Sequence, residues 1–168
     1  MMADNYGTVA GADAYHSARG NIVWAGLTEP EKLAALLRAS EWIDGNYRML
    51  FPGWKVGNRA QVREWPRNSA YDVFAYLIDP TTVPTEVEMA TYEAALREAI
   101  SPGALSVDFT GADVIKKAAV EGAVSVEFCG DGSSASAQLV MPSVDAILAP
   151  ILVAGGTGGG LSGSRVRS

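Results

Sequence analysis

The residues that could do chemistry are few in this chain. Its only histidine, His16, stands beside Ser17, and its only cysteine, Cys129, follows a predicted strand. One residue of each type cannot assemble the usual cysteine–histidine zinc site within a single chain, and a catalytic triad would depend entirely on His16. We therefore expect His16 to be an ordinary surface or packing residue and Cys129 to be a small buried hydrophobic residue.

Two further patterns have structural explanations. Acidic pairs stand at two expected helix starts, where capping and the helix dipole favour negative charge. They are Glu29 with Glu31, and Glu86 with Glu88. The glycine run GGTGGG lacks the Lys-Ser/Thr that completes a phosphate-binding loop, and no helix is expected after it. We therefore predict no catalytic residue, no cofactor and no metal site, and we expect that the protein is not an enzyme.

Composition and charge limit the partners. Hydrophobic residues make up 48% of the 168, which is enough for a real core. The formal net charge of −6 and the isoelectric point near 4.7 argue against a general nucleic-acid binder, because phosphate contacts rely on clustered Lys and Arg. The tail after Leu152 carries Arg165 and Arg167 and no acid, which leaves −8 for the rest. A basic tail on an acidic body predicts that the tail contacts an acidic surface, such as a neighbouring copy.

The lone cysteine also limits the compartment. It cannot form an internal disulfide, and the first residues have neither the basic region nor the apolar run of a secretion signal. No apolar stretch approaches the roughly 18 residues that cross a bilayer. We therefore expect a soluble protein that is made in a reducing cytoplasm and has no membrane partner.

The best-specified element is an amphipathic helix over Leu27–Tyr47. Thr28 and Glu31 have the spacing of a capping box, and Pro30 suits the first turn, where its missing N–H is not needed. Mostly apolar residues then recur at a spacing of three or four, which predicts one buried face. This face comprises Leu33, Leu36, Leu37, Ser40, Ile43 and Tyr47. Trp42 falls nearly opposite, so it needs a second contact.

A second helix is predicted over Thr85–Ile100. Thr85 and Glu88 repeat the capping-box spacing. Its expected apolar stripe comprises Met89, Tyr92, Leu96, Ala99 and Ile100. Ala90 and Ala94 give this helix a second side of small residues, which suits close approach to a neighbour.

Shorter elements complete the secondary structure. Gly11–Arg19 is expected to form a short helix, and Trp24 should anchor the lead-in to the main helix. Alternation of apolar and polar residues around 113–129 predicts a β-hairpin. Near the C-terminus, Ser143 should cap another short helix.

The predicted fold class is mainly α: a small helical bundle with a β-hairpin and an extended C-terminal arm. We expect residues 1–152 to form the helical domain, with the hairpin at about 113–129. Residues 153–168 are glycine-rich and cannot bury enough surface to hold themselves folded, so we expect a flexible arm.

The connection between Phe51 and Asp79 is rich in aromatic and basic residues. These are Trp54, Trp65, Tyr71, Phe74 and Tyr76, with Lys55, Arg59, Arg63 and Arg67. Their apolar area is too large for a solvated linker, so the segment should pack on the helices or present a contact surface. In the simpler interpretation the aromatic residues anchor a loop that the cations solvate. In the alternative they form a surface for a partner protein or a DNA backbone.

Several segments follow one another in a recognisable order: DAYHSARGNIVW, LTEPEKLAALLRASEWIDGNY, FPGW, QVREWPR and VPTEVEMATYEAAL. With these segments in this order, the chain resembles the head-to-tail adaptor, or connector, proteins of tailed bacteriophages, including the group labelled DnaT-like single-stranded-DNA-binding proteins. The resemblance covers about the first hundred residues. VIKKAAVEGAVSVEF and MPSVDAILAPIL extend it more loosely to about residue 152.

The resemblance implies a structural virion protein that assembles as a homo-oligomeric, typically dodecameric ring beneath the portal protein. Such a ring lies in the virion neck after synthesis in the host cytoplasm. It joins the portal to tail or head-completion proteins, and it continues the channel for double-stranded DNA without sequence-specific binding. The resemblance implies no catalytic residues. The alternative is a single-stranded-DNA-binding module, in which aromatic stacking and cations hold the strand.

Two sets of contact residues follow as hypotheses. The portal-binding set combines the short C-terminal helix with the tail: Ile147, Leu148, Ile151, Leu152, Leu161, Arg165, Val166 and Arg167. The second set, for subunit or tail contacts, lies in the aromatic connection: Trp54, Arg63, Trp65 and Arg67. The DNA-binding alternative would depend on this second set.

Overall fold

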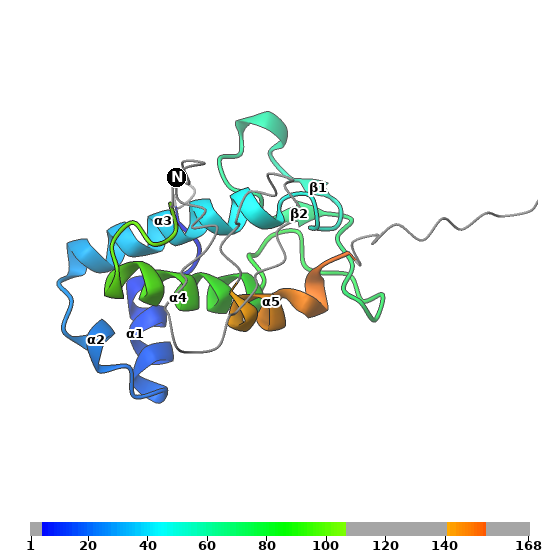
Figure 1. The fold of residues 1–168 in the computed structure, drawn as a ribbon. Coiled ribbons are helices and arrows are strands. Elements are labelled where there is room, and N and C mark those ends of the chain that lie inside the picture. Colours follow the sequence, from blue (N-terminus) through cyan, green and yellow to red (C-terminus); the bar gives the residue numbers. More distant parts are fainter. Residues whose placement is uncertain (1–4, 107–140, 154–168) are drawn as a thin grey trace, which may run out of the picture.

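The computed structural model describes residues 5–106 and 141–153. This part of the chain is mainly helical, which confirms the predicted fold class. Its α-helices are α1 (Val9–Ala18), α2 (Ile22–Ala25), α3 (Glu29–Tyr47), α4 (Thr85–Ile100) and α5 (Pro142–Leu148). Figure 1 shows α3 and α4 side by side, with α1 and α2 at one end of the bundle and α5 beside α4. Within the two described ranges, no helix is long and apolar enough to span a membrane.

Small residues bring α3 and α4 together. Ala35 and Ala39 on α3 are buried, and so are Ala90 and Ala94 on α4. Without long side chains between them, the two backbones approach closely, and this pair makes the most extensive contact between elements. The buried Ser40 hydroxyl turns inward to the Leu36 carbonyl of its own helix, at 2.7 Å, so this polar group costs little in the core.

The helix α3 begins directly after Thr28, the N-cap residue of its predicted capping box. The Glu31 carboxylate accepts from the Thr28 backbone N–H at 2.8 Å and from the Thr28 hydroxyl at 2.7 Å. The bounds of α4 are also as predicted, but its expected capping box is wrong. Pro84 is the N-cap residue, and no side chain caps this end. The Pro84 carbonyl accepts instead from the N–H groups of Val87 and Glu88.

The predicted buried faces are partly wrong. Leu33 and Leu37 of α3 and Ile100 of α4 are exposed. The contact between the helices runs through alanines, so the faces that meet are rotated away from these larger side chains. Trp42, expected to lie opposite the core, is buried, and its ring meets that of Tyr47 edge-on at a centroid distance of 5.9 Å.

The C-terminal helix uses its apolar side within the protein. Val144 and Leu148 of α5, with Ile151 of the following 3-10 turn η2 (Ala149–Ile151), are buried in the core. The Tyr47 hydroxyl donates to Asp145 at 2.5 Å and ties α3 to α5. Met141, not Ser143, is the N-cap residue, because Pro142 occupies the first turn.

The long connection is ordered, as its aromatic content predicts. It contains β1 (Trp54–Lys55), the 3-10 turn η1 (Asn58–Ala60) and β2 (Arg67–Asn68). The strands pair antiparallel, with Trp54 opposite Asn68. Gly53 has φ +66°, and a Cβ there would lie 2.1 Å from the Asn68 carbonyl oxygen, so this close turn requires glycine. The hairpin predicted at about 113–129 and the arm at 153–168 lie outside the described residues, apart from Val153.

The alanine contact generates a test of the fold. Ala39→Leu inserts a large side chain between α3 and α4, so we expect the free energy of unfolding to fall by about 1–3 kcal/mol. Chemical denaturation measures this change. Ala34→Leu on the exposed side of the same helix is the matched control and should change stability by less than about 0.5 kcal/mol. Equal effects of the two substitutions would contradict the close-packed arrangement.

Candidate interaction surfaces

Three of the four connection residues predicted to make contacts have internal roles. Trp65 is 1% exposed, and its ring meets that of Phe51 edge-on at a centroid distance of 5.5 Å. Arg67 is buried and donates to the Pro52 carbonyl at 2.7 Å, the Gly53 carbonyl at 2.8 Å and the Glu64 carboxylate at 2.8 Å. Its guanidinium therefore fastens the turn between α3 and β1 rather than facing a partner.

Arg63 belongs to a second buried network. It lies 3.5 Å from Asp44 of α3, and the other oxygen of that carboxylate accepts from the Tyr6 hydroxyl at 2.5 Å. The same hydroxyl accepts from the Trp65 backbone N–H at 3.1 Å. Burial raises the pKa of Asp44, while the Tyr6 hydroxyl and the Arg63 guanidinium oppose that rise. The network joins the N-terminal segment, α3 and the connection.

Most cations of the described ranges are compensated by neighbouring carboxylates. Each of six lies within 4.0 Å of an acidic side chain: Arg19, Lys32, Arg38, Lys55, Arg63 and Arg67. Neighbouring carboxylates therefore partly neutralise these charges. The basic residues of the connection do not form a continuous basic surface.

The exposed part of the connection is a small loop that we call the aromatic finger, residues 71–77. An isolated antiparallel bridge between Tyr71 and Leu77 closes it. Phe74 is 74% exposed and Tyr76 is 72% exposed. Tyr71 and Val73 each expose more than half of their surface. Such a concentration of exposed apolar side chains is typical of an interaction site.

The finger has a defined shape. The Asp72 carboxylate accepts from the N–H groups of Phe74 at 2.9 Å and Tyr76 at 2.8 Å. The backbone N–H of Asp72 also donates a hydrogen bond to the Tyr76 carbonyl. At its base, the Val73 N–H donates to the Pro150 carbonyl at 2.9 Å, which anchors the finger to η2. The aromatic side chains are thus presented on a fixed loop.

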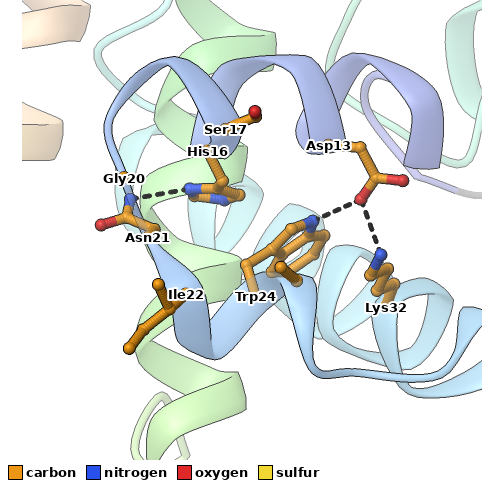
Figure 2. A pocket seen from close by; sticks show the side chains of 9 residues that line it. Asp13, His16, Ser17, Gly20, Asn21, Ile22, Trp24 and Lys32 are labelled. Atoms are coloured by element: carbon orange, nitrogen blue, oxygen red, sulfur yellow. Dashed lines mark hydrogen bonds and ion pairs between the residues drawn. The ribbon is translucent and has the colours of Figure 1, made fainter.

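A pocket of about 370 Å³ opens between α1, α2 and the start of α3. We call it the α1–α2 pocket. Asp13 accepts from the Trp24 indole N–H at 2.7 Å and pairs with Lys32 at 2.8 Å, as Figure 2 shows. These interactions lower the pKa of Asp13, the Lys32 bond most strongly. The pocket is also lined by Ile22, which is 83% exposed, and by Asn21.

His16 forms the inner wall of this pocket. It is 1% exposed, its ring lies 4.7 Å from that of Trp24 between centroids, and its Nδ1 lies 3.1 Å from the Asn21 amide nitrogen. Burial lowers its pKa. Ser17 points away from the imidazole (Figure 2). His16 is therefore a packing residue, as expected, and no group of acidic, histidine or cysteine side chains suited to a metal occurs among the described residues.

Some of the remaining predicted contact residues belong to the core, and the others lie in the tail beyond residue 153. Leu148 and Ile151 are buried, and Ile147 and Leu152 are half-buried against the core. Leu161, Arg165, Val166 and Arg167 lie outside the described residues. Of the second predicted set, Trp54 alone is exposed. The sequence identified the aromatic residues of the finger but not their exposure. Asp72, an Asx-turn former that precedes Phe74 and Tyr76, was the signal that could have predicted the exposed loop.

These features define a small, mainly helical protein with compensated internal charges and a projecting aromatic loop. The chain belongs to the family described as "Putative DnaT-like ssDNA binding protein", whose model matches residues 1–168. No curated protein and no solved structure matches the chain. The DnaT-like part of the resemblance is thereby confirmed.

The buried arginine generates a test that separates structure from binding. Arg67→Ala leaves two buried turn carbonyls without their donor and leaves the Glu64 carboxylate with Lys55 at 3.7 Å, so we expect a loss of about 3 kcal/mol in the free energy of unfolding. Arg59→Ala, at an exposed position of the same connection, should change stability by less than about 0.5 kcal/mol. Urea denaturation of both variants measures the difference. A stable Arg67→Ala protein would refute the internal role.

The buried histidine predicts a pH dependence. Because burial lowers the pKa of His16, the unfolded chain binds this proton at a higher pH than the folded protein. The stability that neutral His16 supplies is complete above its usual pKa of 6.5 and is lost as the pH falls below that value. We expect Tm to fall more steeply between about pH 7.5 and about pH 5.5 for the wild type than for His16→Phe. Parallel curves would contradict this, since the chain has no other histidine.

Proposed function

We propose that this protein is a structural virion component that forms a ring between the capsid portal and the tail. The observation that carries the proposal is the aromatic finger, residues 71–77. It exposes Tyr71, Phe74 and Tyr76, yet its loop is fixed by Asp72 and anchored on η2. Exposing aromatic surface on a fixed loop has no benefit for the isolated chain, whereas a protein partner can bury it.

The charge distribution supports a protein partner over DNA. The chain carries −6 overall, and three of the four cations of the connection, Lys55, Arg63 and Arg67, pair with carboxylates of the same chain. Binding to phosphates needs uncompensated cations, so an acidic ring would let double-stranded DNA pass without holding it. The proposed ring is a homo-oligomer of twelve copies. The chain is made in the host cytoplasm, and the ring lies in the virion neck. It contacts the portal protein on one side and tail or head-completion proteins on the other. It has no enzymatic activity.

Single-stranded DNA binding is the second candidate function. The description of the family as DnaT-like ssDNA binding proteins favours it. Exposed aromatic side chains such as Trp54, Phe74 and Tyr76 offer faces on which bases could stack. The exposed Arg59 would supply charge near the connection. This candidate requires affinity that falls steeply with salt, because phosphate contacts release counterions.

Co-sedimentation with the purified portal ring tests the proposal, with single-stranded DNA as a parallel bait. We expect the full-length chain to bind the portal and the double variant Phe74→Ser/Tyr76→Ser to lose at least about tenfold in affinity, because buried aromatic anchors dominate such interfaces. The matched control is Val62→Ser, which removes a similarly exposed apolar side chain outside the finger. A chain truncated after Leu152 shows whether the tail with Arg165 and Arg167 contributes to the same contact.

The outcomes are distinct. Portal binding that the finger variant loses and the control keeps supports the adaptor. Salt-sensitive retention of DNA without the portal overturns it in favour of the second candidate. Retention of neither bait contradicts both functions.

A further inference from the structure

Two interaction features lie at opposite ends of the protein. The α1–α2 pocket is built from the helices at one end of the bundle in Figure 1. The aromatic finger is tied to η2, beyond the far end of α5, through the bond from Val73 to Pro150. One chain therefore carries a projecting apolar loop at one end and a recess at the other.

The pocket suits an aromatic side chain. Its apolar lining comes from Ile22, Trp24 and Ala25, and Asn21 and Lys32 add polar groups. Ile22 is 83% exposed, which is unusual for isoleucine and leaves apolar surface open on this recess. A ring with a hydroxyl, such as that of tyrosine, matches this combination of apolar lining and polar groups.

We propose that the aromatic finger of one copy seats in the α1–α2 pocket of the next copy. This rests on the proposed function, in which copies of the chain form a ring. Because the two surfaces differ and lie at opposite ends, the contact is heterologous, and such contacts generate a ring when the rotation between copies closes. Each aromatic side chain contributes about 150–250 Å². The three aromatic residues of the finger are 52–74% exposed, so the finger can bury a few hundred Å², which is a substantial part of the roughly 800 Å² per partner of a standard interface.

A second copy fits the pocket better than the chain's own tail does. Residues 154–168 contain no aromatic side chain, whereas the finger exposes Tyr71, Phe74 and Tyr76. A symmetric contact between two fingers would leave Ile22 exposed and would stop at a dimer. In the experiment that follows, a contact between two fingers predicts dimers of the Phe74→Cys protein alone, and a pocket filled by the tail predicts no mixed dimer.

Thiol crosslinking of the full-length chain tests the contact. In a Cys129→Ser background, Phe74→Cys marks the finger and Ile22→Cys marks the pocket. A mixture of these two single-cysteine proteins, treated with a short bis-maleimide, should give covalent dimers that contain one copy of each. A protein that carries both cysteines should give a ladder of higher multimers. Val62→Cys mixed with Phe74→Cys is the matched control, because Val62 is exposed but lies in neither feature, and it should give at least about tenfold less dimer.

The result that overturns the inference is the absence of the mixed dimer above the control level. Dimers formed by the Phe74→Cys protein alone would also overturn it, because they indicate a symmetric contact between fingers. Covalent closure within the doubly substituted monomer, without a ladder, would also overturn the inference, because it would mean that the finger reaches the pocket of its own chain. Crosslinks without portal binding would leave this contact standing and refute the adaptor, whereas portal binding without crosslinks would refute only this contact.

Discussion

The close contact between α3 and α4 is the constraint on which the rest of the structure depends. Alanines on both helices remove the side chains that would otherwise hold the backbones apart. Leu36 and Ile43 of α3 are fully buried beside these alanines, whereas Leu33 and Leu37 are exposed. The same core cluster includes Trp24 of α2 and Trp65 of the connection, so it extends beyond the two long helices.

Several ion pairs of this protein join separate elements of its fold. Arg38 of α3 pairs with the buried Glu98 of α4 at 2.9 Å, and that carboxylate also accepts from the Gly103 N–H, so one acid helps to join two helices and the turn after them. Together with the arginines of the connection, this leaves an acidic protein whose cations mostly serve its own fold. A surface with this balance favours contacts made through apolar side chains.

Helix positions could be predicted from the sequence, whereas the faces that they bury could be predicted only in part: Leu36, Ile43 and Tyr47 of α3 are buried as expected, but Leu33 and Leu37 are exposed. The capping residues around α3 and the Pro-bounded start of α4 are local signals, so they survive in the fold. Which side of a helix is buried depends on its neighbour: the small-residue side of α4 with Ala90 and Ala94 is buried as predicted, whereas Ala35 and Ala39 of α3 were not recognised as buried. For the same reason the connection's aromatic residues were recognisable, but the inward position of Trp65 and the outward position of Phe74 were not. The α1–α2 pocket needs three helices and has no local signal.

The buried Tyr6 has a consequence for how the protein opens. Its N–H donates to Ser40 of α3, and its hydroxyl contacts both Asp44 and the backbone of Trp65. A single side chain thus spans three segments that are far apart in sequence, and none of them can detach without breaking the same contacts. We therefore expect the connection to open together with α3 and the N-terminal segment rather than as a separate foldon.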